Sequence, residues 1–182
     1  MAPSLLFSPA PYHILAYGTF LGTTFFHSFI NGIVAIQTLP RAQFALLQSR
    51  LFPIYFSMQT AIPIVLTLTY PLDKTTIGGR SGVAGVLAPA NRWAVLAPIA
   101  LMFLAGLANL VVVGPATARC MRDRKSQERK DGKRSFDPPP HSQEMVALHK
   151  KFGMLHGISS LLNLSAFIGS VIYGITLSAR IQ

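Results

Sequence analysis

The sequence predicts an all-α, polytopic membrane protein: a four-helix transmembrane bundle with a protruding cytosolic helical hairpin. The first observation is that four tracts contain no Asp, Glu, Lys or Arg, at 1–40, 51–72, 93–118 and 152–179. Each tract holds at least the ~20 residues that a helix needs to cross ~30 Å of hydrocarbon. The second is the composition, with 51% hydrophobic and 12% charged residues, where soluble domains average about 25% charged residues.

The four predicted spans cover about 13–37, 51–71, 93–118 and 152–179, and they form a single membrane domain, residues 1–182. A soluble fold would instead need four long helices buried on every side. A chain of this length is too short to bury them, so the membrane interpretation is preferred.

The connections between the spans show local patterns. Phe44, Leu47 and Leu51 share one helical face in the first linker, which predicts a turn or two lying in the membrane interface. Pro63 is expected to kink the second span. The 73–92 loop is rich in glycine, which predicts an irregular and mobile connection. Its glycines are Gly78, Gly79, Gly82 and Gly85.

The basic loop 119–151 is predicted to fold as a helical hairpin. No helix breaker precedes Gly132, and Ser142 is a suitable N-cap for a helix that continues into the fourth span. Each of the two helices would have ~36 residues and a length of about 54 Å, so the hairpin would stand several turns out of the bilayer. Its ten Lys and Arg against five acids favour anionic lipid headgroups as partners. Alternatively, these charges only fix the topology and solvate a loop.

Charge asymmetry predicts the orientation. The termini and the 73–92 loop share one side, with 4 Lys and Arg, whereas the 41–50 and 119–151 loops on the other side carry 12. The positive-inside rule makes the richer side cytosolic, so both termini are expected to be lumenal or exterior. The N-terminus lacks the cationic start of a cleavable signal, and residues 1–40 contain no Arg, unlike a mitochondrial presequence. An endomembrane or the plasma membrane is therefore expected.

The sequence shows no recognisable catalytic machinery. The single cysteine, Cys120, excludes an intramolecular disulfide and a cysteine-based zinc or iron–sulfur site. It lies beside Arg119 and Arg122, where it is either an acylation site or an incidental thiol. No phosphate loop, Ser-His-Asp arrangement or carboxylate pair occurs. We therefore expect no enzyme, no catalytic residue, no metal ion, no cofactor and no nucleic-acid partner.

An unpartnered polar group inside a membrane span is costly, and six polar side chains of the predicted spans are the candidates for a functional layer. They are His27, Asn31, Gln59, Asn109, His156 and Asn163. At 1.5 Å per residue they lie between about 6 and about 15 Å from the predicted cytosolic ends of their helices, which places them in one layer. This layer either hydrogen-bonds the helices together or forms a site for an ion, a polar solute or a lipid headgroup.

Two further patterns concern the spans. His27 and His156 raise the alternative of a haem or metal site, although they would lie ~9 Å apart along the membrane normal and no span contains an acidic residue. Two GxxxG motifs predict close helix packing, because glycine lets backbones approach. Their residues are Gly18, Gly22, Gly153 and Gly157.

Several motifs occur in order along the chain. They are Phe44-Ala-Leu-Leu-Gln48 with Leu51-Phe-Pro-Ile-Tyr-Phe56, Asn109 with Gly114-Pro-Ala-Thr117 and Met121, and Phe152-Gly-Met-Leu-His-Gly157 with Leu161-Leu-Asn-Leu164. Together they resemble the transmembrane protein 205-like family across all four spans. The resemblance implies a small four-span protein of endomembranes or the cell surface, associated with vesicle trafficking or secretion. It supplies no catalytic residues.

Three functions remain open at this point. The leading hypothesis is a small membrane protein that supports trafficking or export, with the polar layer as a solute or lipid pocket. The first alternative is a structural subunit or assembly factor of a larger membrane complex, or a homo-oligomer. The second is a haem-binding membrane oxidoreductase that uses His27 and His156.

Overall fold

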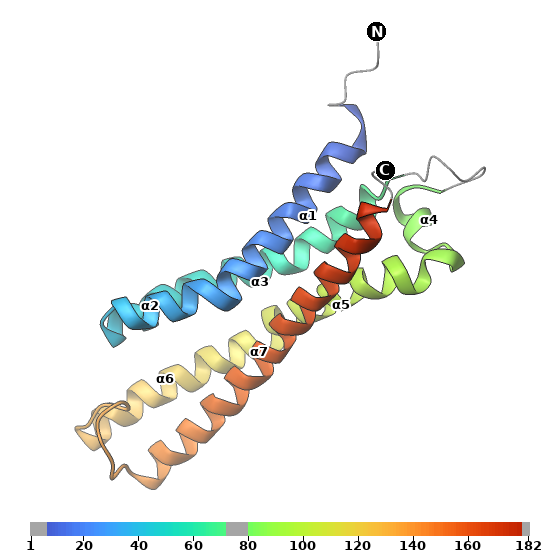
Figure 1. The fold of residues 1–182 in the computed structure, drawn as a ribbon. Coiled ribbons are helices and arrows are strands. Elements are labelled where there is room, and N and C mark those ends of the chain that lie inside the picture. Colours follow the sequence, from blue (N-terminus) through green and yellow to red (C-terminus); the bar gives the residue numbers. More distant parts are fainter. Residues whose placement is uncertain (1–6, 72–79, 180–182) are drawn as a thin grey trace.

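The computed structural model describes residues 7–71 and 80–179 and contains four long helical segments (Figure 1). All four are long and apolar enough to cross a membrane, and the described residues form no β-strand. The segments are Pro9–Thr38, Arg41–Leu68, Pro89–Asp131 and Gln143–Ser178. The predicted fold class is therefore confirmed, and the chain is a multi-pass membrane protein.

Two of the segments change helical geometry along their length. The first comprises α1 (Pro9–Phe25), the π-helical η2 (Phe26–Asn31) and α2 (Gly32–Thr38). The third comprises the 3₁₀ turn η3 (Pro89–Asn91), the π-helical η4 (Arg92–Leu96), α5 (Ala97–Ala108), the π-helical η5 (Asn109–Val113) and α6 (Gly114–Asp131). The others are α3 (Arg41–Leu68) and α7 (Gln143–Ser178), and the short α4 (Gly82–Val86) precedes the third segment.

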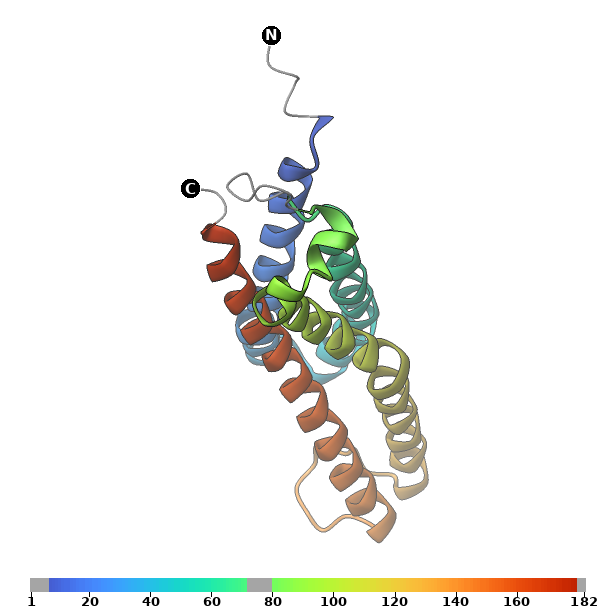
Figure 2. The same ribbon diagram turned by 90° about the vertical axis from the view of Figure 1, so that its right-hand side faces the viewer.

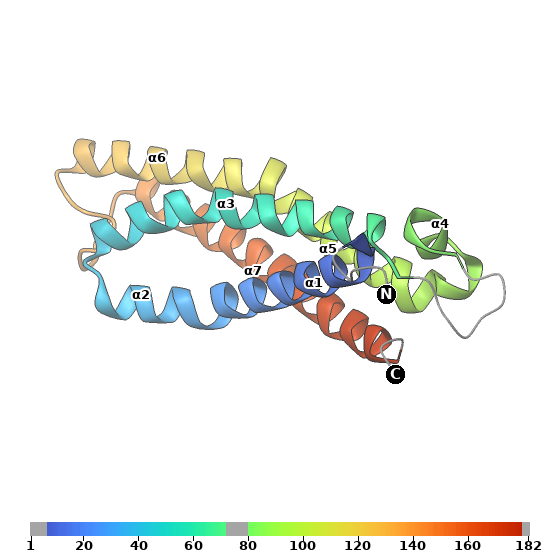
Figure 3. The ribbon, with the colours of Figure 1, turned by 90° about the horizontal axis from the view of Figure 1, so that it is seen from above.

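The bundle is elongated, and its two ends differ. The start of α1, the end of α7 and α4 lie at one end, whereas the α2–α3 turn and the α6–α7 turn lie at the other (Figure 1 and Figure 3). The α6–α7 hairpin extends away from the end that carries α4 (Figure 2). This is the arrangement that four successive crossings require, with the two basic loops at the same end.

The boundaries of the basic hairpin match the sequence prediction. Gly132 ends α6 in the left-handed conformation with φ 63°, where glycine has no Cβ to clash. Ser142 caps α7, because its hydroxyl accepts a hydrogen bond from the Met145 N–H at 3.2 Å. These two residues therefore end one helix and begin the next.

Cys120 joins the two helices of the hairpin. Its side chain is fully buried, and its thiol donates to the Leu148 carbonyl at 3.6 Å. Burial raises the pKa of this thiol, which disfavours the reactive thiolate. The structure thus favours a packing role for Cys120 over acylation.

The first linker differs from the prediction. Residues 41–50 are not a separate interfacial turn but the first turns of α3, which begins at Arg41 directly after Pro40. Proline at the start of a helix is tolerated because the first N–H groups have no intrahelical acceptor. No helix breaker follows until Pro53, and the helix then continues through Pro53 and Pro63 to Leu68. The kink expected at Pro63 stays a prediction.

The 73–92 loop is more ordered than predicted in its described part. Residues 82–86 form α4, and the Gly82 N–H donates to the Tyr70 carbonyl at 2.9 Å. The Asn91 side chain donates to the Gly85 carbonyl at 2.8 Å, which closes the segment onto itself. Gly78 and Gly79 lie outside the described residues.

The core lies between α1, α3, α5 and α7. Leu66, Met102 and Tyr173 are fully buried there. The backbones of α5 and α3 approach closely at Gly106, where a Cβ would lie 2.8 Å from the Gln59 carbonyl carbon. Glycine is required at this position because any side chain would push the helices apart.

The GxxxG glycines behave differently from Gly106. All four are exposed, and an added Cβ at any of them would meet nothing within 4 Å. Among the described residues, therefore, no neighbouring helix packs closely on these four glycines. Contact with another chain stays a prediction.

The outer surface of the bundle is apolar. Leu104, Leu161 and Ile175 are 59%, 68% and 69% exposed. In the most apolar stretch of each long segment, only 17% to 39% of the residues are buried inside the chain. Soluble proteins rarely expose apolar patches of this extent, so the surface fits a hydrocarbon environment.

Replacing Gly106 with alanine is expected to destabilise the bundle, because the new methyl group would overlap the α3 backbone. The expected cost is about 1–3 kcal/mol, typical of overpacking. Thermal unfolding of the purified protein in detergent measures it. Gly157→Ala is the matched control and should not lower the melting temperature, since its Cβ meets open space and alanine favours helix. Equal losses in the two variants would contradict the packing described here.

Candidate functional site

Two π-helical turns carry part of the predicted polar layer. His27 and Asn31 lie on η2, and Asn109 begins η5. A π-helical turn disrupts the regular hydrogen bonding of an α-helix and frequently occurs at functional sites. The sequence pattern gave no indication of these turns.

The first group of polar side chains connects α3 to η2. Asn31 Nδ2 donates to His27 Nδ1 at 3.2 Å, and the His27 ring lies 4.3 Å from the Tyr55 ring, centroid to centroid. Gln59 Nε2 in turn donates to the Tyr55 hydroxyl at 3.1 Å. Three of the predicted residues are thus brought together, with Tyr55 as the link that the sequence analysis missed.

The second group is an asparagine pair between the third and fourth segments. Asn109 Nδ2 donates to Asn163 Oδ1 at 3.1 Å, and the two residues are 0% and 8% exposed. Asn109 lies about one turn after Gly106, where α5 touches the backbone of Gln59. Along the bundle the asparagine pair is therefore close to Gln59, the last residue of the first group.

His156 does not join the layer. It is exposed on α7, and its ring stacks on Phe152 at 5.9 Å. His27 is instead held by Asn31 and Tyr55, so the structure does not bring the two histidines together as the haem alternative requires. Among the described residues no group of three His, Cys, Asp or Glu could hold a metal ion.

Three buried polar atoms of the layer have no hydrogen-bond partner in the described chain: His27 Nε2, Gln59 Oε1 and Asn109 Oδ1. Because an amide nitrogen only donates, His27 Nδ1 is the acceptor of the Asn31 bond, and the proton of the neutral ring lies on Nε2. The neighbouring rings of Phe52 and Tyr55 offer this N–H only weak π acceptors. One donor and two acceptors thus remain unsatisfied in a region where each costs free energy.

A groove of about 180 Å³ opens beside the first group. It lies between α1, η2 and α3, and His27, Asn31 and Tyr55 contribute its polar side chains together with Thr23. The apolar part of its wall consists of Phe26, Leu51, Ile54 and Met58. Apolar walls with a few convergent polar groups are the usual chemistry of a small-molecule site.

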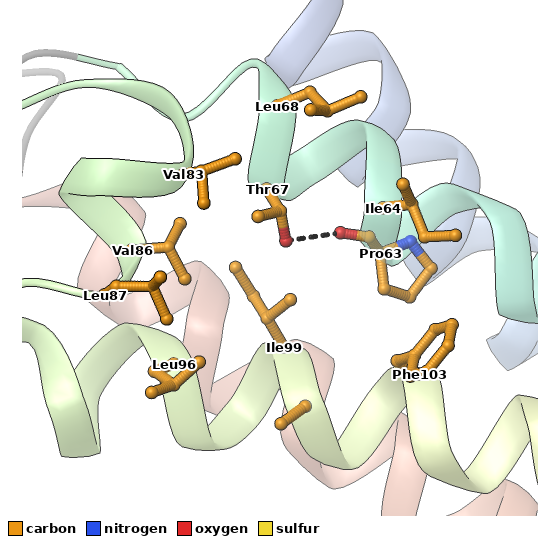
Figure 4. A pocket seen from close by; sticks show the side chains of 11 residues that line it. Pro63, Ile64, Thr67, Leu68, Val83, Val86, Leu87, Leu96, Ile99 and Phe103 are labelled. Atoms are coloured by element: carbon orange, nitrogen blue, oxygen red, sulfur yellow. Dashed lines mark hydrogen bonds between the residues drawn. The ribbon is translucent and has the colours of Figure 1, made fainter.

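A larger cavity of about 330 Å³ lies elsewhere, between α3, α4 and α5 (Figure 4). Its one polar side chain, Thr67, is already bonded to the Pro63 carbonyl at 2.9 Å. The remaining wall is apolar, including Val86, Ile99 and Phe103. Because this cavity offers no free polar group, the smaller groove is the better candidate for specific binding.

One buried polar cluster was not predicted. His13 on α1 is 1% exposed, with Nε2 2.6 Å from the Tyr173 hydroxyl of α7 and Nδ1 3.0 Å from the Thr69 hydroxyl. Both ring nitrogens are therefore partnered, and the cluster ties three segments together at the end that carries α4. In the sequence His13 is a single polar residue near the start of the first charge-free tract, and no pattern there predicts its hydrogen-bond partners.

The fold and the site together define the class: a multi-pass helical membrane protein with a polar layer inside an apolar bundle. The chain belongs to the family described as "Domain of unknown function (DUF4149)", whose profile matches residues 15–126. It is also 28% identical over 171 residues to xanthocillin biosynthesis cluster protein D of Aspergillus fumigatus. That similarity covers 94% of this chain and 90% of the relative. No solved structure matches the chain.

The asparagine pair allows a test of how the layer contributes to stability. Asn109→Leu and Asn163→Leu should each destabilise the protein by about 0.6–2 kcal/mol, because each leaves one buried amide without its partner. The double variant removes both amides and should lose less than the sum of the single losses. Thermal unfolding in detergent measures all three. Strict additivity would show that the two side chains do not interact.

Proposed function

We propose that this protein binds the polar end of a small amphipathic molecule at the groove beside His27 and supports the export or membrane trafficking of such molecules. It acts without catalysing a reaction and carries no cofactor. In this proposal the chain lies in an endomembrane or the plasma membrane with both termini lumenal or exterior.

The observation that carries the proposal is the buried and unpartnered N–H of His27, a residue that lines a mostly apolar groove. Its proton position follows from the Asn31 bond, so the missing partner is a hydrogen-bond acceptor. An oxygen atom of an amphipathic ligand would accept this hydrogen bond. Because Nε2 is buried, a side chain would have to move to uncover it. The apolar wall would accommodate the hydrocarbon part of the ligand.

One comparison supports a role in handling small molecules. One relative is named for a biosynthesis cluster, and the products of such clusters are small molecules. The association with trafficking and secretion rests on the sequence resemblance to the transmembrane protein 205-like family alone, which neither the family match nor the xanthocillin relative names. The matching family itself has no described function.

A structural role in a larger complex is the second candidate. It is favoured by the outward position of the GxxxG glycines, which leaves Gly18 and Gly157 open to close approach by a helix of another chain. A fixed stoichiometry with a second protein after purification would support this alternative.

Replacing His27 with phenylalanine tests the proposed site, because it keeps an aromatic ring and removes the N–H donor. Protein purified into nanodiscs from its native membrane is extracted, and the bound small molecules are identified by mass spectrometry. We expect at least one species to be depleted about tenfold in His27→Phe, the effect of losing one buried hydrogen bond. His156→Phe is the matched control and should retain that species.

The proposal fails if no extracted species depends on His27 while the variant elutes as a folded protein. A depletion of the same size in His156→Phe would also contradict it, since His156 is exposed and does not line the groove. The secreted small molecules of cells that carry each variant in place of the native protein provide the second measurement.

A further inference from the structure

The two helices of the basic hairpin leave the apolar tracts at the same level. The last uncharged residues are 118 on α6 and 152 on α7. The Cys120 thiol contacts the Leu148 carbonyl at 3.6 Å, and the Arg124 guanidinium lies 4.8 Å from the centre of the Phe152 ring. Residues 119–125 and 149–151 are therefore neighbours in space, directly outside the predicted hydrocarbon boundary.

These residues carry the whole excess of positive charge in the hairpin. We call the six cations the collar, and they are Arg119, Arg122, Arg124, Lys125, Lys150 and Lys151. Asp123 is the one acid among them. The remainder of the hairpin, 126–148, has four cations and four acids. The basic character of this loop is thus concentrated in the two turns next to the membrane.

Three of the four acids of the distal part are engaged in folding the turn. Glu128 accepts a hydrogen bond from the Ser135 N–H at 2.9 Å, and Asp137 accepts from the Arg134 N–H at 2.8 Å. Asp131 accepts from the Gln127 amide and from the Ser142 hydroxyl. These carboxylates fix the chain reversal and do not neutralise the collar.

The collar side chains remain available for an anion. All of them are exposed except Arg124, which is half-buried. Arg124 lies over Phe152, donates to the Met121 sulfur at 3.5 Å, and has an Nε atom without a hydrogen-bond partner. Burial and the nearby charge of Arg124 lower the pKa of His149, so this histidine adds no charge to the collar at neutral pH.

We propose that the collar binds the phosphate groups of anionic lipids in the leaflet at this end of the bundle, which the positive-inside rule identifies as the cytosolic leaflet. Seven residues of helix cover about 10 Å, enough to cross the headgroup layer of about 5–7.5 Å on one side of a bilayer. Juxtamembrane Lys and Arg attract anionic headgroups within this distance. The neutral distal part of the hairpin would stand beyond the lipids and contribute little.

The experiment compares two triple variants of the full chain that remove the same charge from different levels. The collar variant is Arg122→Gln, Lys125→Gln and Lys150→Gln, and the distal variant is Arg129→Gln, Lys130→Gln and Arg134→Gln. Arg124 is left intact because it packs on Phe152. Each protein is purified from mixed vesicles of phosphatidylcholine and phosphatidylserine, and the ratio of the two retained lipids is measured by mass spectrometry.

The lipids retained by the wild type and by the distal variant should be enriched in phosphatidylserine relative to the vesicles. In the collar variant this enrichment should be at least about tenfold lower. Added salt should weaken the enrichment, since exposed charges are screened. A second collar variant, Lys125→Gln, Lys150→Gln and Lys151→Gln, should behave as the first and guards against misfolding of one combination.

Four outcomes would overturn the proposal. No preference for phosphatidylserine in the wild type, or an unchanged preference in both collar variants, would mean that these charges only orient the chain. Equal losses in the collar and distal variants would point to the net charge of the loop and not to its position. Displacement of phosphatidylserine by soluble inorganic phosphate would indicate a free anion as the ligand.

Discussion

The structure depends on the fact that its surroundings are hydrocarbon and not water. Most of the apolar surface of the four long segments points outward, since at most 39% of the most apolar stretch of any segment is buried within the chain. In water such a surface would drive aggregation. In a bilayer it costs nothing, and the backbone is satisfied because each segment is helical throughout.

The same constraint explains why polar side chains lie inside. Lipid offers no hydrogen bonds, so His13, Gln59, Asn109 and Asn163 are all buried between helices, where other side chains supply partners. The partnering is complete at His13 but incomplete at Gln59 and Asn109. This contrast separates a cluster that holds the bundle together from a layer with unused hydrogen-bonding capacity, and it is the basis for locating a binding site in the layer.

The sequence predicted the positions of the helices well, because they depend on local chemistry: charge-free length, the N-cap Ser142 and the terminating Gly132. It predicted helix faces less well. Hydrophobicity does not distinguish the inner face of a membrane helix from its lipid-facing side, so His156 and Gly157 were expected inside although both are exposed. The Asn109–Asn163 pair was located by depth alone. The role of Tyr55 depends on the register between two segments, which no single-helix pattern contains.

The most direct test of the account is whether lipid covers the outward side chains. Cysteines replace Leu104, Val111 and Leu161, which are 59%, 57% and 68% exposed, one at a time in a Cys120→Ser background. A water-soluble maleimide is then applied to membrane fragments that expose both faces of the bilayer and contain no detergent. Arg129→Cys is the reactive reference. The account predicts rapid labelling of the reference and none at the three apolar positions until the chain is unfolded. Labelling of Leu104→Cys at the rate of the reference would contradict the membrane-spanning fold.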